Sequence, residues 1–195
     1  MKKAALHNLG CKVNAYETEA MQHLLEEAGY EIVPFTQKAD VYVINTCSVT
    51  NMADRKSRQM LHKAKKNNPD SIVVAAGCYV QTSEKEVLND LSVDIVIGND
   101  RKHDLVRLLE EYSLDSVNDT VDDINDGKHD FEELFIDQTK EHTRAFIKVQ
   151  DGCNQFCSYC IIPYARGRVR SRRFENVIAE VERLAANGFK EVVLT

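Results

Sequence analysis

The sequence has no apolar run of about 18 residues, which is the length that a membrane-spanning helix needs. Its first residues, MKKAALHNLGCKVN, include two lysines but no long apolar stretch before a cleavage site, and this start is typical of a cytoplasmic protein. Walker-type loops, GxGxxG fingerprints and nucleophile elbows are also missing. The six histidines have no metal-ligand spacing. These absences direct attention to the cysteines.

The composition is that of an ordinary globular protein. Hydrophobic residues make up 43% and charged residues 29% of the 195 positions, enough for one domain and part of another. The formal net charge is −6, so any contact with nucleic acid has to use a local basic patch.

The first half of the chain alternates strand-like and helix-like segments. Strands are expected at 3–9, 30–35, 41–46, 71–77 and 94–99, and helices at 16–29, 53–69, 83–91 and 102–113. Continuous Val/Ile runs separated by helices are typical of a parallel sheet covered on both faces. The sequence therefore predicts a doubly wound α/β domain over roughly residues 1–112.

The second half changes character twice. Residues 113–142 carry ten acidic residues and no clean hydrophobic period, which predicts an acidic linker. Residues 143–195 then predict a strand, a cysteine loop, a helix and a second strand. One such βαβ unit is too little sheet to close a fold, so we expect a piece of a longer protein.

The six cysteines form two sets of three, which fits two metal clusters better than a disulfide scaffold in a cytoplasmic protein. Cys11, Cys47 and Cys78 follow the first, third and fourth expected strands. Parallel strands end at one edge of the sheet, so these three thiols are expected to converge there. The alternative is three unrelated buried cysteines.

The second set is Cys153, Cys157 and Cys160, spaced CxxxCxxC. A 4Fe–4S cluster has four iron corners, and three thiolates leave one of them open. Zinc with a distant histidine and a purely structural role stay open as alternatives on spacing alone.

The CxxxCxxC loop after a strand resembles the motif of radical S-adenosylmethionine (SAM) enzymes, which fold as full or partial (β/α) barrels. The resemblance implies that SAM binds the open iron and is cleaved to a 5′-deoxyadenosyl radical. It places Tyr159 near the adenine of SAM, with ordinary loop packing as the alternative. Residues 143–195 would then be the first βαβ unit of a truncated barrel.

The segments NLGCKVNAYETE, VINTCSVTNMADRKSRQ and GCYVQ resemble the methylthiotransferase branch of that superfamily. The resemblance implies two 4Fe–4S clusters, SAM, a tRNA substrate and a reductant protein, with the first cysteine set assisting sulfur delivery. The expected product carries a methylthio group at C2 of N6-threonylcarbamoyladenosine at tRNA position 37. The resemblance also implies that later barrel strands and an RNA-binding domain are missing, so we expect the chain to be inactive alone.

Several alternatives remain open at this point. Methylthiolation of isopentenyladenosine or of a ribosomal protein fits less well, because Lys12 and Val13 stand where those relatives tend to carry Gln–Met or Pro–Lys. A non-catalytic metal-binding or electron-transfer module and a flavodoxin-like domain with incidental cysteines are alternatives of another class.

Five arginines follow the second cysteine set and suit phosphate and carboxylate groups. Arg166, Arg168, Arg170 and Arg173 are candidate RNA-binding residues. Ser171 and Arg172 are weaker candidates for the SAM or substrate region. A solvated charged surface is the alternative, and it is favoured for the basic helix at 53–69.

Overall fold

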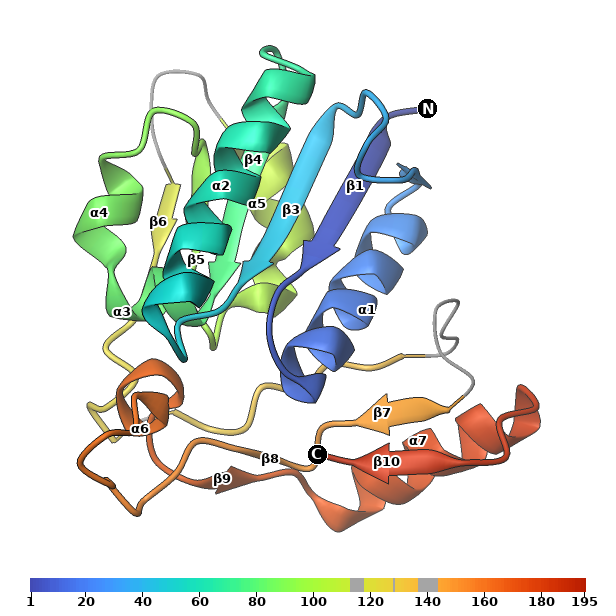
Figure 1. Cartoon of the computed structure of the whole chain (residues 1–195). Coiled ribbons are helices and arrows are strands. Elements are labelled where there is room, and N and C mark those ends of the chain that lie inside the picture. The colour runs from blue at the N-terminus through green and yellow to red at the C-terminus, as the bar shows by residue number, and fades with distance from the viewer. Residues whose placement is uncertain (113–117, 128, 137–143) are drawn as a thin grey trace.

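The computed structural model describes residues 1–112, 118–127, 129–136 and 144–195. Its main feature is a sheet of six parallel strands in the order β2-β1-β3-β4-β5-β6 (Figure 1). The strands are β1 (Lys3–Asn8), β2 (Glu31–Ile32), β3 (Val41–Thr46), β4 (Ile72–Gly77), β5 (Ile95–Ile97) and β6 (Asn118–Thr120). The predicted parallel α/β sheet is confirmed.

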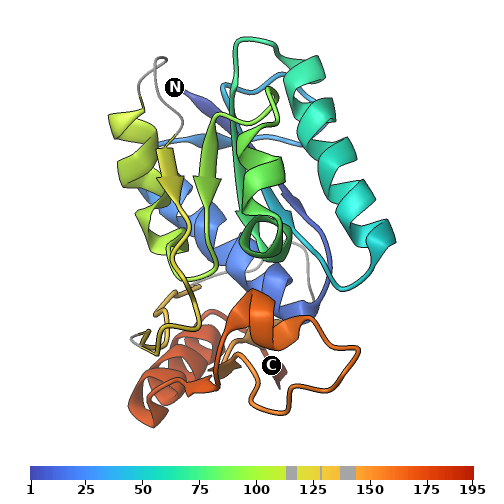
Figure 2. The ribbon, with the colours of Figure 1, turned by 90° about the vertical axis from the view of Figure 1, so that its left-hand side faces the viewer.

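Helices cover both faces of the sheet (Figure 2). On one face lie α1 (Lys12–Glu27), a short 3-10 turn η1 (Lys102–Asp104) and α5 (Leu105–Glu111). On the other lie α2 (Asn51–Asn67), α3 (Cys78–Thr82) and α4 (Glu84–Leu88). All six residues of β3 are buried because this central strand is covered on both sides, which explains the apolar run at 41–44.

The strand register aligns the carboxyl ends at one edge of the sheet. Asn8 pairs with Asn45, and Thr46 pairs with Gly77, so β1, β3 and β4 end side by side. Side chains that follow these strands therefore start from neighbouring positions, which is the usual place for a ligand in an open α/β sheet.

The C-terminal part lies against this edge (Figure 1). It contains β7 (Ala145–Ile147), α7 (Phe174–Ala186) and β10 (Val192–Leu194), with β7 and β10 parallel, as the predicted βαβ unit requires. Between them, β8 (Gln150–Asp151) pairs antiparallel with β9 (Arg170–Ser171), and α6 (Ile162–Arg166) follows the second cysteine set.

Some elements differ from the prediction. The expected strand at 144–151 is divided into β7 and β8, and α3, α6 and β9 were not expected. Within the predicted linker, residues 118–120 join the sheet as β6, and the buried side chains of Leu134 and Ile136 pack with Tyr16 and Leu184. Residues 113–117, 128 and 137–142 of that segment lie outside the described residues. In the described ranges, no helix has the combination of length and apolarity needed to cross a bilayer.

Candidate functional site

The first cysteine set gathers at the carboxyl edge of the sheet. Cys11 is the N-cap residue directly before α1, Cys47 follows β3, and Cys78 is the first residue of α3 after β4. The β1–α1 loop packs tightly on Cys47, because a Cβ added to Gly10 would lie 2.8 Å from its Sγ atom. The edge thus brings the predicted set together.

The geometry at Gly77 explains how Cys78 reaches this place. Gly77 has φ +98°, and an added Cβ would lie 2.5 Å from Asn45 Oδ1 and 2.7 Å from the Thr46 carbonyl oxygen. Only glycine fits a left-handed conformation so close to another backbone. The chain can therefore turn from β4 directly into α3, with Cys78 next to the end of β3.

The three thiols differ in accessibility. Cys11 is exposed, whereas Cys47 and Cys78 are 4% and 3% exposed. Burial raises the pKa of Cys47, and the negative charges of Cys78 and Cys11 contribute in the same direction. These contributions to the pKa of Cys47 agree with the placing of the three sulfur atoms in one region at this edge.

A pocket of about 250 Å³ opens beside Cys47. It is lined by Leu9, Gly10, Cys47, Val49, Thr50, Met52, Ala53 and Lys56. The buried thiol can therefore be approached from this side by a small molecule.

The second cysteine set lies on the loop between β8 and α6. The Cys153 N–H donates to the Gly167 carbonyl oxygen at 3.0 Å, and the Cys160 N–H donates to the Cys157 carbonyl oxygen at 2.9 Å. Cys157 is exposed, and Cys153 and Cys160 are half-buried. The loop is closed by its own backbone while its thiols stay accessible.

Aromatic and arginine side chains support this loop. Phe156 has φ +48°, and its ring packs edge-on against Tyr164 with centroids 5.7 Å apart. The Arg168 guanidinium carbon lies 4.3 Å from the centroid of the Phe156 ring. Tyr159 is 90% exposed, so it is available to a ligand rather than packed in the loop.

All six cysteines are free thiols, and each set offers three of them, the number that leaves one iron of a 4Fe–4S cluster open. In the part of the chain that the structure describes, no group of three Cys, His, Asp or Glu side chains is arranged to hold one metal ion.

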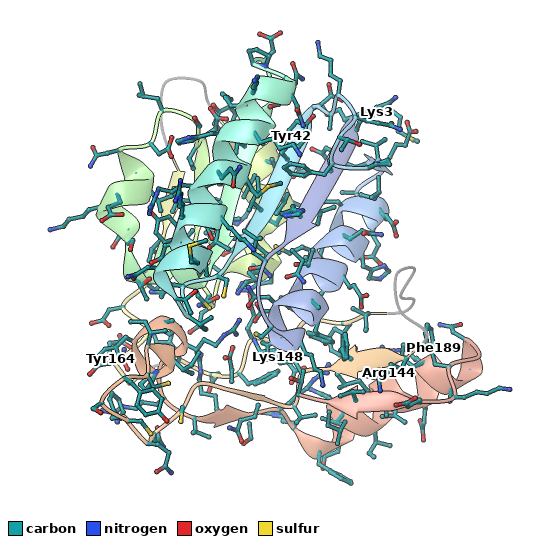
Figure 3. All side chains as sticks on the ribbon, in the orientation of Figure 1. Lys3, Tyr42, Arg144, Lys148, Tyr164 and Phe189 are labelled. Atoms are coloured by element: carbon teal, nitrogen blue, oxygen red, sulfur yellow. The ribbon has the colours of Figure 1, made fainter. Side chains whose placement is uncertain are left out.

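A buried ion network joins the two parts of the molecule. Arg166 Nη1 donates to Glu17 Oε1 at 2.9 Å and to Asp151 Oδ1 at 3.0 Å. Lys148 Nζ lies 2.8 Å from Glu17 and 2.5 Å from Asp151, and Lys102 Nζ lies 3.3 Å from Glu17. Figure 3 shows Lys148 pointing from the C-terminal part toward the lower end of α1. None of these five side chains is more than 4% exposed.

The pKa shifts in the network favour the charged forms of its carboxylates and of Arg166. Burial alone would raise the pKa of Glu17, but Arg166, Lys102 and Lys148 hold it well below its usual range. Burial opposes ionisation of Asp151 as well, yet Lys148 and Arg166 lower its pKa to about 2. Burial alone would lower the pKa of Arg166, but Glu17, Asp151 and Cys78 outweigh this effect and hold the pKa well above its usual value. Sequence reasoning missed this network, because it named only Arg166, and named it as a candidate RNA-binding residue. One signal was available, because Glu17 precedes Met21 and Leu25 at four-residue intervals on the apolar face of α1.

The five candidate arginines differ in their exposure and in their partners. Arg168 and Arg173 are exposed, as is Ser171. Arg166 is 4% exposed and bound within the ion network. Arg170 forms an ion pair with Asp100.

Arg172 is 6% exposed and belongs to a second buried cluster at the same junction. It pairs with Glu180 and donates to the Leu134 carbonyl oxygen at 3.1 Å. Tyr16 Oη donates to that same oxygen. Arg172 thereby connects α1, the acidic segment and α7, and its guanidinium is engaged inside the protein.

Comparisons with known proteins divide the chain in the same way. The family model "Uncharacterized protein family UPF0004" matches residues 3–98, and the model "Radical SAM superfamily" matches residues 147–195. The chain is 47% identical over 197 aligned residues to the threonylcarbamoyladenosine tRNA methylthiotransferase MtaB of Bacillus subtilis, covering 100% of the chain and 43% of that protein. It is 45% identical to MtaB of Aquifex aeolicus, covering 99% of the chain and 47% of that protein.

A tRNA-2-methylthio-N(6)-dimethylallyladenosine synthase of a Thermoanaerobacter species is 35% identical, covering 97% of the chain and 41% of that protein. The chain thus spans less than half the length of these curated relatives. Both matched regions carry a cysteine set, and the similarity to the relatives runs through the whole chain. The chain is therefore similar, along its whole length, to radical SAM methylthiotransferases.

Proposed function

We propose that the chain is part of a tRNA methylthiotransferase that adds a methylthio group to C2 of N6-threonylcarbamoyladenosine at position 37. The observation that carries this proposal is the placing of two cysteine sets on either side of one buried ion network. The relatives named MtaB are 35–47% identical to the chain and the dimethylallyladenosine synthases 34–35%, so the highest identities favour the threonylcarbamoyl substrate. A tRNA substrate implies a cytoplasmic location.

Cys153, Cys157 and Cys160 would hold a 4Fe–4S cluster that binds SAM at its open iron and supplies the electron for cleavage of the sulfonium. The protein side chains around this loop have separate tasks. Exposed Tyr159 offers a flat apolar face to the adenosyl group, and Arg168 is steadied by its stacking on Phe156. Ser171 lies exposed on β9, eleven residues after Cys160, and stays a weaker candidate for this region.

Cys11, Cys47 and Cys78 would hold a second 4Fe–4S cluster that assists sulfur delivery. The pocket beside Cys47 gives a small sulfur donor access to this set. A purely aliphatic environment would not favour three thiolates, and the nearby guanidinium of Arg166 supplies the opposite charge.

The RNA contact is assigned to the arginines that remain exposed. Arg168 and Arg173 are free of the buried networks and flank the cysteine loop and the start of α7. Each phosphate contact releases counterions, so replacing both with glutamine should weaken tRNA binding and flatten its dependence on salt. Because the net charge of the chain is −6, binding of nucleic acid has to use locally exposed cations such as these two arginines.

The metal content tests the two-cluster assignment. After anaerobic reconstitution we expect about eight irons per chain, falling to about four in Cys153→Ala/Cys157→Ala/Cys160→Ala and also in the matched variant Cys11→Ala/Cys47→Ala/Cys78→Ala. Zinc, or iron that is unaffected by the second variant, would contradict the assignment of the first cysteine set. Colourless and redox-silent protein would favour a non-catalytic metal module.

The substrate is tested with the full-length protein, a chemical reductant, SAM and tRNA that lacks the methylthio group. Mass spectrometry of nucleosides should show 2-methylthio-N6-threonylcarbamoyladenosine, and only in the presence of both cysteine sets. Methylthiolation of an isopentenyladenosine tRNA in its place would overturn the substrate assignment while leaving the chemistry intact. Replacing the chemical reductant with cell fractions would then identify the physiological electron donor protein.

A further inference from the structure

Arg166 is separated from the first cysteine set by a single amide side chain. Its Nη2 atom donates to Asn14 Oδ1 at 2.6 Å, and the same oxygen lies 3.9 Å from Cys11 Sγ. Asn14 is itself fixed, because its Nδ2 atom donates to the carbonyl oxygens of Leu9 and Thr46 at 2.7 and 2.9 Å. The guanidinium therefore has a defined position relative to two of the cysteine loops.

The side-chain amide of Asn99 links α6, the helix that carries Arg166, to Cys78. Asn99 Nδ2 donates to the Ala165 carbonyl oxygen at 2.5 Å and lies 3.7 Å from Cys78 Sγ. Lys102 Nζ donates to Asn99 Oδ1 at 2.8 Å, so the amide cannot turn away. The last turn of α6, which follows the second cysteine set, is thus held directly against the first set.

The ion network at this point brings several charges close to the thiols. Arg166, Lys102 and Lys148 are cations that pair with the carboxylates of Glu17 and Asp151. Arg170, which pairs with Asp100, lies 4.0 Å from Asp151 and extends the network. None of these side chains is more than 9% exposed, so solvent screens their charges only weakly. Two of the cations reach the thiols through one amide each, Arg166 through Asn14 to Cys11 and Lys102 through Asn99 to Cys78.

We infer that Arg166 is a positioning residue of the radical SAM part that holds a buried positive charge beside Cys11 and Cys78 and raises the reduction potential of the group bound there. The inference rests on the proposed function, since it requires a cluster at the first cysteine set. One-electron reduction makes such a group more negative by one charge. A fixed cation close by stabilises the reduced form more than the oxidised form.

The test measures the midpoint potential of the first site alone, by an EPR-monitored titration with dithionite. All variants carry Cys153→Ala/Cys157→Ala/Cys160→Ala so that only the first site can contribute. Arg166→Gln should lower the equilibrium constant for reduction at least tenfold, which is about 59 mV for one electron. Arg166→Lys keeps the charge and should restore most of the difference.

Two further variants separate charge from structural damage. Arg172→Gln removes another buried arginine from the same junction, but Arg172 bonds to Glu180 and Leu134 and to neither cysteine, so the potential should not change. Glu17→Gln removes an anion from the Arg166 network and should raise the potential. Because Glu17→Gln should shift the midpoint potential in the opposite direction to Arg166→Gln, it tests the inference even if Arg166→Gln does not fold.

Each outcome has a clear meaning. Equal shifts in Arg166→Gln and Arg172→Gln, or a downward shift in Glu17→Gln, would overturn the role of Arg166. Iron that binds normally with an unchanged potential in Arg166→Gln would overturn this inference alone. If the parent with only the first cysteine set binds no iron, both this inference and the two-cluster part of the proposed function fail.

Discussion

Replacing Gly77 with alanine should destabilise the protein far more than the same change at Gly29. Both glycines have positive φ, +98° and +85°, so both substitutions incur the left-handed strain of about 1–2 kcal/mol. At Gly29 nothing lies within 4 Å of an added Cβ, whereas at Gly77 the Cβ would lie 2.5 Å from Asn45 Oδ1 and 2.7 Å from the Thr46 carbonyl oxygen. Backbone shifts forced by overpacking add about 1–3 kcal/mol at Gly77.

The assay is urea or thermal unfolding of the two variants beside the parent. For a chain of this size about 1 kcal/mol corresponds to about 2–4 °C in Tm. We expect a loss of about 2–8 °C for Gly29→Ala and about 4–20 °C for Gly77→Ala, the latter with less iron bound because Cys78 is displaced. Equal losses in the two variants would refute the argument that Gly77 is required by close backbone approach.

Two further predictions concern charged pairs. Glu180→Ala removes the buried carboxylate partner of Arg172 and leaves it only the half-buried Glu133, so it should lower the free energy of unfolding by about 1.5–3 kcal/mol. Glu191→Ala, which breaks an exposed pair, should cause no measurable change in urea unfolding. His103 has a raised pKa, mainly through its hydrogen bond with Glu132. Its stabilising effect is fully present below the ordinary histidine pKa of about 6.5 and is lost as the pH rises through the folded-state pKa, so the stability gap to His103→Gln should close above that pH. A gap that is constant with pH would contradict this linkage.

The sheet could be predicted because its strands are locally distinct. The runs at 41–44 and 72–77 are continuous and apolar, and the structure places β3 and β4 there, since strands buried on both faces need such side chains. β6 gave no such signal. Its sequence, NDT, has few strand-forming residues, and it becomes a strand only through pairing with β5 at the edge of the sheet.

The cysteine positions could be predicted for the same reason, since strand ends in a parallel sheet are known once the strands are known. The role of Arg166 could not. Its charge lies in an arginine run that indicated an RNA-binding surface, yet its partner Glu17 is 149 residues away in the sequence. Lys148 likewise meets Glu17 across 131 residues. Ion pairs of this range leave no local pattern, because only the packing of the two parts brings them together.

The long sequence separation of the junction pairs has a consequence for the order of assembly. The sheet is made by residues 1–120, most of whose pairings join neighbouring segments, so it can form early during synthesis. Glu17 and Lys102 then remain hydrated until Lys148 and Arg166 have left the ribosome. During that interval the edge that carries Cys11, Cys47 and Cys78 is uncovered, and it closes only when α6 docks. Until α6 docks, the three thiols at this edge are therefore open to solvent.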